Sequence, residues 1–451
     1  MTVLDLPYVT VEPHELDGYR VDRSGLPATA RPLAVARPTS VAQVQEVLRH
    51  ASAHGIPVTT RGAGTGLAGG AVASGDGIVL DLTALDRIES IDAVDQIAVV
   101  GPGVVTADLD AAAAAHGLRY APDPASAAVS TVGGNIATNA GGLRCLKYGV
   151  TRDAVRSLDV VLADGRLVHL GAATTKSVVG YDLARLIVGS EGTLGVVVRA
   201  TVSLVPLPVR TATAVGYFDS VAAAARAVAA IGATGVRPAV AELIDRRSLA
   251  AIDELRGSEL SGRGEALLLV QTDGFGAEEE IGLVAGVLRE QARDVTVTDD
   301  PVLAAELLAV RRDALPAIEA RGRVLIEDIA VPVSRLAEAF DRVAEVSART
   351  GVPIFTFAHA GDGNLHPIVL VEPSLVDPAD PDRVPDVVRE AADEVFALAL
   401  ALGGSVSGEH GVGLLKRAWL ERELDPVALE LQRGVRALFD PAGILNPGKA
   451  L

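Results

Sequence analysis

Three of the eight histidines lie in the last quarter of the chain, in two segments that are typical of turns. His359 ends the strand-like run IFTFAH, and AGDGNL returns the chain so that His366 begins the next run. Such a hairpin can place both imidazoles on one side. Glu409 and His410 lie in the turn SGEHG, which can bring a carboxylate to the same point. Two imidazoles and one carboxylate are typical of a catalytic divalent-metal site, but strand-end histidines also occur as hydrogen-bonded residues alone, so both interpretations stay open.

Three glycine-rich loops are the second feature that could do chemistry. Residues 61–70 read RGAGTGLAGG directly after a strand-like run. A dinucleotide-binding helix would have to open at these glycines, yet only residues 71–77 precede the next strand, so a Rossmann unit is excluded. Two more loops, at 122–142 and 187–195, combine glycine with Ser, Thr and Asn. Backbone N–H groups of such loops can hold a pyrophosphate, so together they predict a bound nucleotide, although the first loop alone could be a surface turn.

Composition limits the partners of the protein. The 451 residues carry 40 Lys and Arg against 58 Asp and Glu, a net charge of −18, which repels phosphate backbones and excludes nucleic acid as a partner. The single cysteine, Cys145, allows no internal disulfide and favours the cytoplasm. The first residues lack a basic region before an apolar stretch, so we expect no signal peptide. Residues 125–143 are uncharged, but their glycines and asparagines argue against a transmembrane segment.

The order of elements predicts two domains. Ser40 and Gln43 have the capping-box spacing ahead of a helix over 41–54, and a second helix is expected over 106–116. The expected strands of this part lie at 58–61, 78–82 and within 155–170 and 195–209. Pro206 and Pro208 then mark a boundary. Beyond it helices alternate with strands, as in long helices packed on one sheet. We predict domains at 1–207 and 208–451, with the C-terminal tail returning to the first.

The motifs resemble those of a known superfamily. RGAGTGLAGGA, PDPAS, TVGGNIATNAGGLRCLKYG, GYDL and VGSEGTLG are similar to the FAD-binding domain of the vanillyl-alcohol oxidase superfamily of FAD-linked oxidases. AHAGDGNLHP, SGEHGVG and LNPGK resemble the branch that holds FAD-dependent D-lactate dehydrogenases, the glycolate oxidase flavoprotein subunit and D-2-hydroxyglutarate dehydrogenase. The resemblance covers about residues 31–450. It implies an α+β fold, with an FAD-binding domain of two subdomains and a cap domain whose antiparallel sheet is flanked by helices.

The same resemblance implies which residues contact FAD. The first loop would hold the pyrophosphate through Arg61, Gly62, Gly64, Thr65, Gly66, Gly69 and Gly70. The adenine, ribose and flavin ring would lie against residues of the other motifs, namely Pro122, Asp123, Ser126, Gly133, Gly134, Asn135, Asn139, Gly142, Gly192, Val196 and Asn446. Some relatives attach the flavin covalently through a histidine of the first loop. This chain has Ala63, Gly64 and Thr65 there, so we expect non-covalent FAD.

For the cap, the resemblance implies a metal-assisted oxidation. His359, His366 and Glu409 would hold Zn²⁺ or Mn²⁺, and His410 would be the base that removes the hydroxyl proton of a 2-hydroxy acid while flavin N5 accepts the hydride. Arg311 or Arg312 would meet the substrate carboxylate as a bidentate fork. The sequence does not choose between these two arginines, and a solvated helix face is the alternative for both.

Two departures bear on the substrate. Relatives that act on 2-hydroxyglutarate carry a lysine where this chain has Ile326, and an asparagine two residues after the second histidine, where this chain has Ile368. Both favour a short D-2-hydroxy acid, D-lactate or glycolate. D-2-hydroxyglutarate dehydrogenation, a transferase like the alkyl-glycerone-phosphate synthases and a catalytically inactive binding subunit are the alternatives. Electrons would pass to a quinone, a cytochrome or an electron-transfer flavoprotein, and an oligomer is compatible with the sequence.

Overall fold

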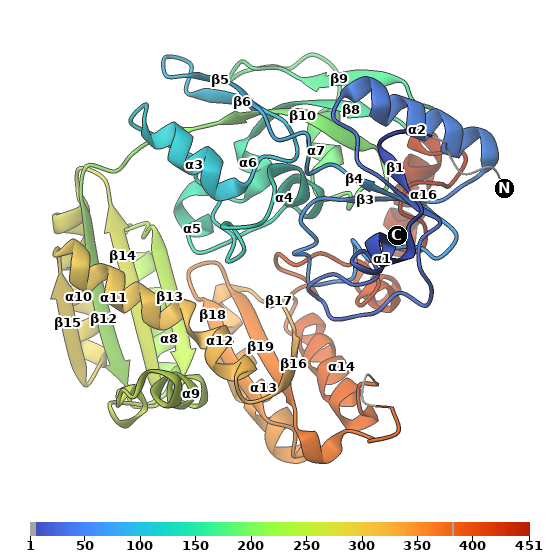
Figure 1. Cartoon of the computed structure of the whole chain (residues 1–451). Coiled ribbons are helices and arrows are strands. Elements are labelled where there is room, and N and C mark those ends of the chain that lie inside the picture. Colours follow the sequence, from blue (N-terminus) through green and yellow to red (C-terminus); the bar gives the residue numbers. More distant parts are fainter. Residues whose placement is uncertain (1–5, 381–382) are drawn as a thin grey trace. The chain divides into compact units, whose positions relative to one another are not determined.

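The computed structural model of the chain describes residues 6–380 and 383–451. These residues form two compact units, whose helices and strands are labelled in Figure 1. Unit 1 consists of Gly149–Leu207, Glu409–Leu451 and the described part of Met1–Gly142. Unit 2 consists of Leu143–Tyr148 and the described part of Pro208–Gly408. Each unit combines helices with sheets, which confirms the predicted α+β class.

The first sheet of unit 1 positions the first glycine loop. Its strand order is β1 (Val9–Thr10), β2 (Ala34–Ala36), β4 (Ile78–Asp81) and β3 (Val58–Arg61), and β4 runs parallel to both β2 and β3. Helix α2 (Val41–His54) connects β2 to β3 and buries Val44, Val47, Leu48 and Ala51 in the core of this sheet. A short helix, α1 (Pro13–Asp17), precedes β2.

The capping of α2 follows the sequence closely. The hydroxyl of Ser40 accepts a hydrogen bond from the Gln43 backbone N–H at 3.4 Å, as the capping box predicts. The Gln43 side chain reaches one residue further back than the motif requires, to the backbone N–H of Thr39 at 2.7 Å. Gly55, with φ of 63°, ends the helix in the left-handed conformation that favours glycine.

The second sheet of unit 1 is antiparallel. Its order is β5 (Ile88–Asp92), β6 (Ile97–Val100), β10 (Val196–Ser203), β8 (Val155–Val161) and β9 (Leu167–Gly171). Leu109, Ile136 and Ile187 come from helices α3 (Thr106–Ala114), α4 (Val132–Thr138) and α7 (Leu183–Ile187), and they share one buried core with this sheet. The remaining short elements here are β7 (Leu118–Arg119), α6 (Thr151–Ala154) and β11 (Val205–Pro206).

The C-terminal segment packs as part of unit 1. It holds the short helices η4 (Arg417–Trp419) and α15 (Leu420–Glu423) and the longer α16 (Pro426–Phe439). After α16 the chain runs beside β3, where the Val58 N–H donates to the Ile444 carbonyl at 2.7 Å and the Asn446 N–H donates to the Val58 carbonyl at 2.8 Å. Hydrogen bonds to strand β3 therefore hold the LNPGK motif beside the strand that leads into the first glycine loop.

Unit 2 is built on one large antiparallel sheet. Its eight strands include, in order, β15 (Asp294–Thr298), β12 (Thr211–Phe218), β14 (Ala266–Asp273), β13 (Val240–Asp245), β18 (Ile354–His359), β19 (Asn364–Val371) and β16 (Arg323–Ile326), and β17 (Ile329–Ala330) also pairs with β19. The sequence did not predict β12 and β13, because TATAVGYF and VAELID contain alanine, glycine and acidic residues, which are depleted in strands. Packing in the centre of the sheet overrides that preference.

Two groups of helices cover this sheet. Helices α9 (Arg246–Arg256), α11 (Pro301–Arg312) and α12 (Ala314–Glu319) share a buried core with Ile244, Leu269, Phe357 and Ile368 of the sheet. Helices α8 (Val221–Ala233), α10 (Ala277–Gln291), α13 (Leu336–Thr350) and α14 (Asp386–Ala401) pack side by side. Short 3₁₀ turns lie at η1 (Leu260–Gly262), η2 (Val333–Arg335) and η3 (Pro373–Leu375). Among the described residues, no helix is both long enough and apolar enough to cross a membrane.

One short segment differs from the predicted boundary. Helix α5 (Cys145–Tyr148) lies in the part of the sequence that we assigned to the first domain, yet it groups with unit 2. Lys147 Nζ donates to the Asp273 carbonyl at 2.6 Å, and Tyr148 Oη donates to the Asp273 carboxylate at 2.7 Å. Leu143 packs against the apolar core of unit 2. These contacts join residues more than a hundred positions apart in the sequence. They explain why the chain passes from unit 1 to unit 2 at residues 143–148 as well as at the prolines near 207.

A buried lysine holds the C-terminal tail in unit 1. Lys449 is 3% exposed, and its ammonium group donates to the Val72 carbonyl and to Asn446 Oδ1 at 2.7 Å. Burial lowers the pKa of Lys449 from 10.5 to about 8, while the charges of Asp22 and Glu191 oppose this shift. The folded protein therefore favours the neutral amine more strongly than the unfolded chain does.

This shift predicts a pH dependence of stability. Between pH 8 and 10.5 the unfolded chain holds a proton on Lys449 that the folded chain releases, so the free energy of unfolding should rise with pH in this window. Lys449→Met should lack this rise. We expect the difference in free energy of unfolding between wild type and variant to change by roughly 2 kcal/mol between about pH 7.5 and 9.5, measured by urea denaturation. The exposed Lys176→Met is the control, and parallel pH profiles for wild type and Lys449→Met would contradict the assignment.

Candidate active site

The three glycine loops and the LNPGK motif meet within unit 1. A Cβ on Gly62 of the first loop would clash with the Thr131 hydroxyl of the second. A Cβ on Gly70 would lie 3.3 Å from the carboxylate of Glu191 in the third. Asn446 of LNPGK donates its Nδ2 to the carbonyls of Gly70 at 3.1 Å and Glu191 at 2.8 Å. Glycine therefore allows the close approach at residue 62 and relieves a tight one at residue 70, and the four motifs lie in one region of unit 1.

The guanidinium of Arg61 is hydrogen-bonded to backbone carbonyls of the protein. It is 9% exposed, and its guanidinium donates to the carbonyls of Ala71 and Val21, each at 3.0 Å. The guanidinium also lies 5.3 Å from the centre of the Tyr19 ring, and burial lowers the pKa of Arg61. Gly64, at φ of 71°, leaves no room for a side chain against this guanidinium. In this arrangement Arg61 shapes the loop, and its predicted contact with the pyrophosphate remains a prediction.

The second loop forms a short helix with a tight entry. The Thr131 hydroxyl accepts a hydrogen bond from the Gly134 N–H at 3.2 Å and caps α4. A Cβ on Gly133 would press against Pro102. Gly133, which the resemblance assigned to the flavin, thus permits a close approach that a larger residue would prevent, whereas a Cβ on Gly134 would make only an ordinary contact with Thr131.

The asparagines of this loop have structural partners. Asn135 is buried and donates to the Thr106 hydroxyl at 2.7 Å. Asn139, at φ of 52°, ends α4 and accepts the Arg152 N–H at 2.9 Å. Gly142 follows at a point where a Cβ would clash with the Asp123 carbonyl. The side chains of both asparagines organise the loop, and their predicted contacts with FAD remain predictions.

Glu191 of the third loop joins that loop to the SGEHGVG motif. Its carboxylate is 8% exposed and accepts the backbone N–H groups of Val412 and Gly413, each at 2.8 Å. Burial raises the pKa of Glu191, and these hydrogen bonds together with the charges of Lys416 and Lys449 oppose the rise. The turn that contains His410 is therefore anchored to unit 1 immediately after that histidine.

The other residues that the resemblance assigned to FAD lie in these loops or at their ends. They are Thr65, Gly66, Gly69, Pro122, Asp123, Ser126, Gly192 and Val196. Val196 begins strand β10 and is fully buried in a core that it shares with residues of the first sheet, and its predicted contact with FAD remains a prediction.

In unit 2, a hairpin brings two histidines together. His359 ends β18 and His366 lies on β19, where it is the direct cross-strand partner of Phe357. The two imidazoles lie on one face of the sheet with ring centres 5.1 Å apart, edge to face. Both are nearly buried, at 6% and 4% exposed. The hairpin expected from IFTFAH and AGDGNL therefore has the geometry that a shared ligand would need.

A glutamate that the sequence analysis did not single out contacts the first histidine. Glu242 of β13 is the direct cross-strand partner of His359, and its Oε1 lies 2.7 Å from His359 Nδ1. Its other oxygen accepts Arg311 Nε at 2.5 Å. The Glu242 side chain is completely buried. One carboxylate thus links the histidine to an arginine of α11.

The structure distinguishes the two candidate arginines. Arg311 is 8% exposed, and its guanidinium lies 4.2 Å from the centre of the Phe357 ring in addition to its ion pair with Glu242. Arg312 is exposed. Consecutive residues of a helix point about 100° apart, so only one of the two can face the sheet. Arg311 is the one that lies beside the histidines, while Arg312 matches the solvated alternative.

Asp328 lies at the same end of the sheet and was also not singled out. It is completely buried, and its carboxylate accepts Asn364 Nδ2 at 2.6 Å and the Ser407 hydroxyl at 2.9 Å. A Cβ on Gly408 would lie 3.0 Å from the same carboxylate. Glu409 and His410 are the next two residues after Gly408, so the chain places them close to Asp328.

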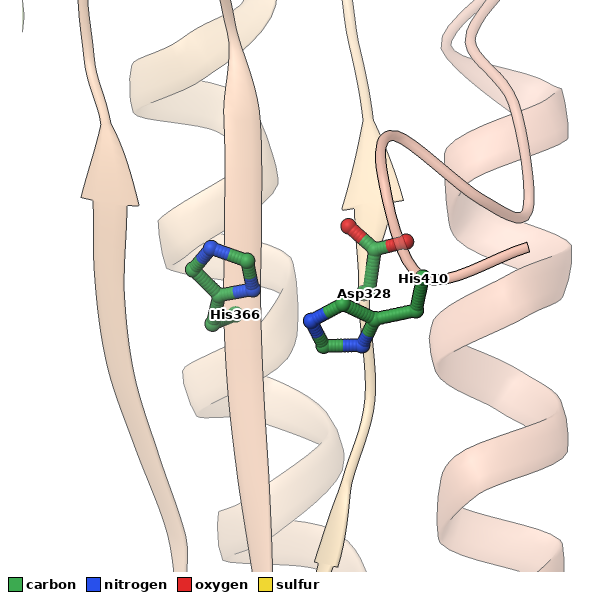
Figure 2. Close-up of side chains that lie close together, drawn as sticks. All are labelled: Asp328, His366 and His410. Carbon is green, nitrogen blue, oxygen red and sulfur yellow. The ribbon is translucent and has the colours of Figure 1, made fainter. Parts of the chain in front are cut away.

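Two overlapping sets of side chains here could hold a metal ion. One ligand atom each from His359, His366 and Glu409 lie within 4.8 Å of one another, and the same is true of Asp328, His366 and His410. Figure 2 shows the second set, in which the side chains of Asp328, His366 and His410 lie close together. Imidazole nitrogens with a carboxylate oxygen suit Zn²⁺ or Mn²⁺, so the residues fit the predicted ion. Because His410 belongs only to the second set, it can be a base when the first set holds the ion.

Two sequence families match the chain. The family described as "FAD linked oxidases, C-terminal domain" matches residues 207–450, which is more than half of the chain, and the one described as "FAD binding domain" matches residues 32–171. The chain belongs to the FAD-linked oxidase family. As an FAD-linked oxidase it is an FAD-dependent oxidoreductase, which confirms the predicted FAD and the predicted oxidoreductase class, while the divalent ion and the non-covalent attachment of FAD remain predictions.

Individual relatives of this FAD-linked oxidase extend the comparison. The glycolate oxidase subunit GlcD of Bacillus subtilis (strain 168) is 39% identical over 93% of this chain and 88% of that protein. A D-lactate dehydrogenase of Archaeoglobus fulgidus is 38% identical over 96% of each chain. The solved structure of p-cresol methylhydroxylase with substrate bound aligns with a TM-score of 0.80 at 18% identity, over 98% of this chain and 93% of that one. This likeness confirms the predicted vanillyl-alcohol oxidase type of fold.

The residues that sequence reasoning missed in this FAD-linked oxidase are buried acids. Glu242 and Asp328 are each completely buried beside the histidines, and Glu191 is nearly so. A signal was present for Glu242, since a lone acid inside the apolar run AVAELI has to be paired if that run is buried. Its partners could not be named, because they lie 69 and 117 residues further along the chain.

Proposed function

We propose that this FAD-linked oxidase oxidises a short D-2-hydroxy acid, D-lactate or glycolate, to the 2-oxo acid. The observation that carries the proposal is the ligand set of His359, His366 and Glu409, with His410 adjacent to it. Two relatives that cover nearly the whole chain, named as a glycolate oxidase subunit and a D-lactate dehydrogenase, support the substrate class.

The proposed roles divide between ligand and base. His359, His366 and Glu409 would hold Zn²⁺ or Mn²⁺, which would lower the pKa of a hydroxyl bound to it. Non-covalent FAD supplies the hydride acceptor at flavin N5. His410 accepts the hydroxyl proton as the C2 hydride leaves the substrate. Because Glu409 and His410 are consecutive, one turn sets the positions of both groups, and Glu191 holds that turn from its other side.

Arg311 is the proposed partner of the substrate carboxylate. Its Nε is taken by Glu242, and the guanidinium as a whole is held against Phe357. A guanidinium fixed in this way has lost its rotational freedom before a carboxylate arrives, which favours binding. Arg312, which is exposed, has no comparable support.

Two isoleucines support a monocarboxylate substrate. Ile326 of β16 and Ile368 of β19 are direct cross-strand partners. By the resemblance, these are the positions at which relatives acting on 2-hydroxyglutarate carry a lysine and an asparagine. Two polar groups that could contact a second carboxylate are thus replaced by a pair of apolar side chains in contact with each other, so we propose that the enzyme discriminates against dicarboxylates.

The second half of the reaction requires an electron acceptor. We propose that a quinone, a cytochrome or an electron-transfer flavoprotein accepts the electrons. We also propose that the protein acts in the cytoplasm, and an oligomer is compatible with this function. A transferase of the alkyl-glycerone-phosphate-synthase type remains the alternative of another class, and its flavin would not be bleached by hydroxy acids.

Anaerobic mixing with a panel of acids tests the proposed function. Purified protein should be yellow, and acid should release all of its flavin as FAD. D-lactate or glycolate should bleach the flavin absorbance, whereas L-lactate should do so far more slowly. D-2-hydroxyglutarate should also react poorly because of Ile326 and Ile368. Flavin that no 2-hydroxy acid bleaches would contradict the proposed activity, and reduction by D-2-hydroxyglutarate alone would contradict the proposed substrate.

Two substitutions separate the base from the ligands. His410→Ala should keep metal and FAD but slow flavin reduction by roughly 10² to 10⁴, the usual worth of a positioned general base. His366→Ala should instead lose the bound ion, as elemental analysis would show, and weaken substrate binding as well. His116→Ala, at an exposed position of unit 1, is the control. Loss of metal from His410→Ala, or reduction at the wild-type rate, would assign the proton to another group.

A further inference from the structure

The Glu242 carboxylate occupies the centre of a buried chain of three charged or polar groups. Its two oxygens accept Arg311 Nε at 2.5 Å and contact His359 Nδ1 at 2.7 Å. All three residues belong to unit 2, and Glu242 and His359 face each other across neighbouring strands. The distance to His359 is in the range of charge-assisted N–H···O hydrogen bonds, and the distance to Arg311 is shorter still.

This geometry determines which nitrogen of His359 carries the proton. Arginine is always a donor and remains charged in proteins, so the carboxylate that it contacts is ionised. An ionised carboxylate can only accept hydrogen bonds. Nδ1 of His359 must therefore be the donor, and in a neutral imidazole the lone pair then lies on Nε2.

We propose that Glu242 is a positioning residue, which fixes the Nδ1–H tautomer of His359 so that its Nε2 is presented to a divalent cation, and which holds Arg311 beside it. This inference rests on the proposed function, because it assigns a partner to one of the proposed metal ligands. Hydrogen bonds of this kind orient metal-binding histidines and increase their basicity. Here the same carboxylate also holds the proposed carboxylate-binding arginine, so one residue sets the positions of two groups.

Glu242→Gln distinguishes this role from simple packing. Glutamine has nearly the same shape, but only one of its two terminal atoms can accept a hydrogen bond. Arg311 can only donate, so the glutamine oxygen should turn to Arg311 and the NH₂ group should face His359 Nδ1. His359 would then have to accept at Nδ1 and carry its proton on Nε2, the nitrogen needed by the metal. The substitution should therefore weaken metal binding without removing any metal ligand.

The matched control is Asp245→Asn on the same strand. The Asp245 carboxylate caps α9 by accepting the Ser248 N–H at 2.7 Å and also accepts the Thr356 N–H at 3.1 Å. It contacts neither histidine of the proposed ligand set in these hydrogen bonds. Neutralising it tests whether loss of a buried carboxylate from β13 is by itself enough to disturb the site.

The first measurement is Zn²⁺ affinity, determined on the FAD-containing protein by competition with a chromophoric chelator. Glu242→Gln should bind Zn²⁺ roughly 10- to 100-fold more weakly than wild type, the usual effect of losing such a partner, while Asp245→Asn binds it nearly as wild type does. Equal Zn²⁺ affinities of wild type and Glu242→Gln, or an equal loss in Asp245→Asn, would overturn the inference and leave the proposed metal site intact. Wild-type protein that binds neither Zn²⁺ nor Mn²⁺ would overturn the metal site as well.

A second measurement does not depend on the folding of Glu242→Gln, because it is made on the wild-type protein. Nitrogen-15 spectra of histidine-labelled wild-type protein, stripped of metal and retaining FAD, report the tautomer of each imidazole. The His359 signals, identified by their absence in His359→Gln, should show a proton on Nδ1 and none on Nε2. A proton on Nε2, or an average of the two tautomers, would overturn the role of Glu242.

Discussion

A charge can be buried in a sheet only if it is paired, and Glu242 shows how the cap meets that constraint. Its completely buried carboxylate lies between Arg311 and His359. Removing Arg311 would leave an uncompensated charge inside the unit, and removing His359 would leave one buried carboxylate oxygen without this hydrogen bond. The arrangement therefore couples helix α11, strand β13 and strand β18, and it sets the two groups that the proposed chemistry uses to bind a carboxylate and a metal. His359 is held by its contact with Glu242 in addition to the strand register that pairs the two residues.

A different constraint operates in unit 1, where backbone segments have to approach one another closely. Gly62 permits the contact with Thr131, and Gly64 permits the first loop to close around the guanidinium of Arg61. Glu191 then fastens the third loop to the turn at Val412 and Gly413. In each case the close approach or the buried charge is accommodated by groups of unit 1 itself.

Short sequence patterns predicted those helix and strand boundaries that depend on residues close by in the chain. The capping of α2 by Ser40 occurs as expected, and the end of the helix at the left-handed Gly55 likewise depends on residues within one turn. The order of the glycine loops and of the AHAGDGNLHP and SGEHGVG motifs was specific enough to predict the superfamily and FAD. The strand β13 was not predicted, because its preference for the sheet comes from neighbours that are distant in the chain.

The same distinction separates the parts of the candidate site. His359 and His366 could be placed together from a hairpin of a few residues. Glu242 and Asp328 could not, because their partners become neighbours only when the whole sheet has formed. Arg311 and Arg312 are adjacent and chemically identical, so only the packing of α11 against the sheet distinguishes them.

The central claim is that the C2 hydrogen of a short D-2-hydroxy acid leaves as hydride while the protein holds the hydroxyl and carboxylate. The most direct measurement is stopped-flow anaerobic flavin reduction by D-lactate carrying deuterium at C2, compared with unlabelled D-lactate, each at saturating concentration. The account predicts that deuterium slows the bleaching of the flavin severalfold without changing its amplitude. Equal rates with the two substrates, where bleaching is complete in both, would contradict C2–H cleavage as the step that this site controls.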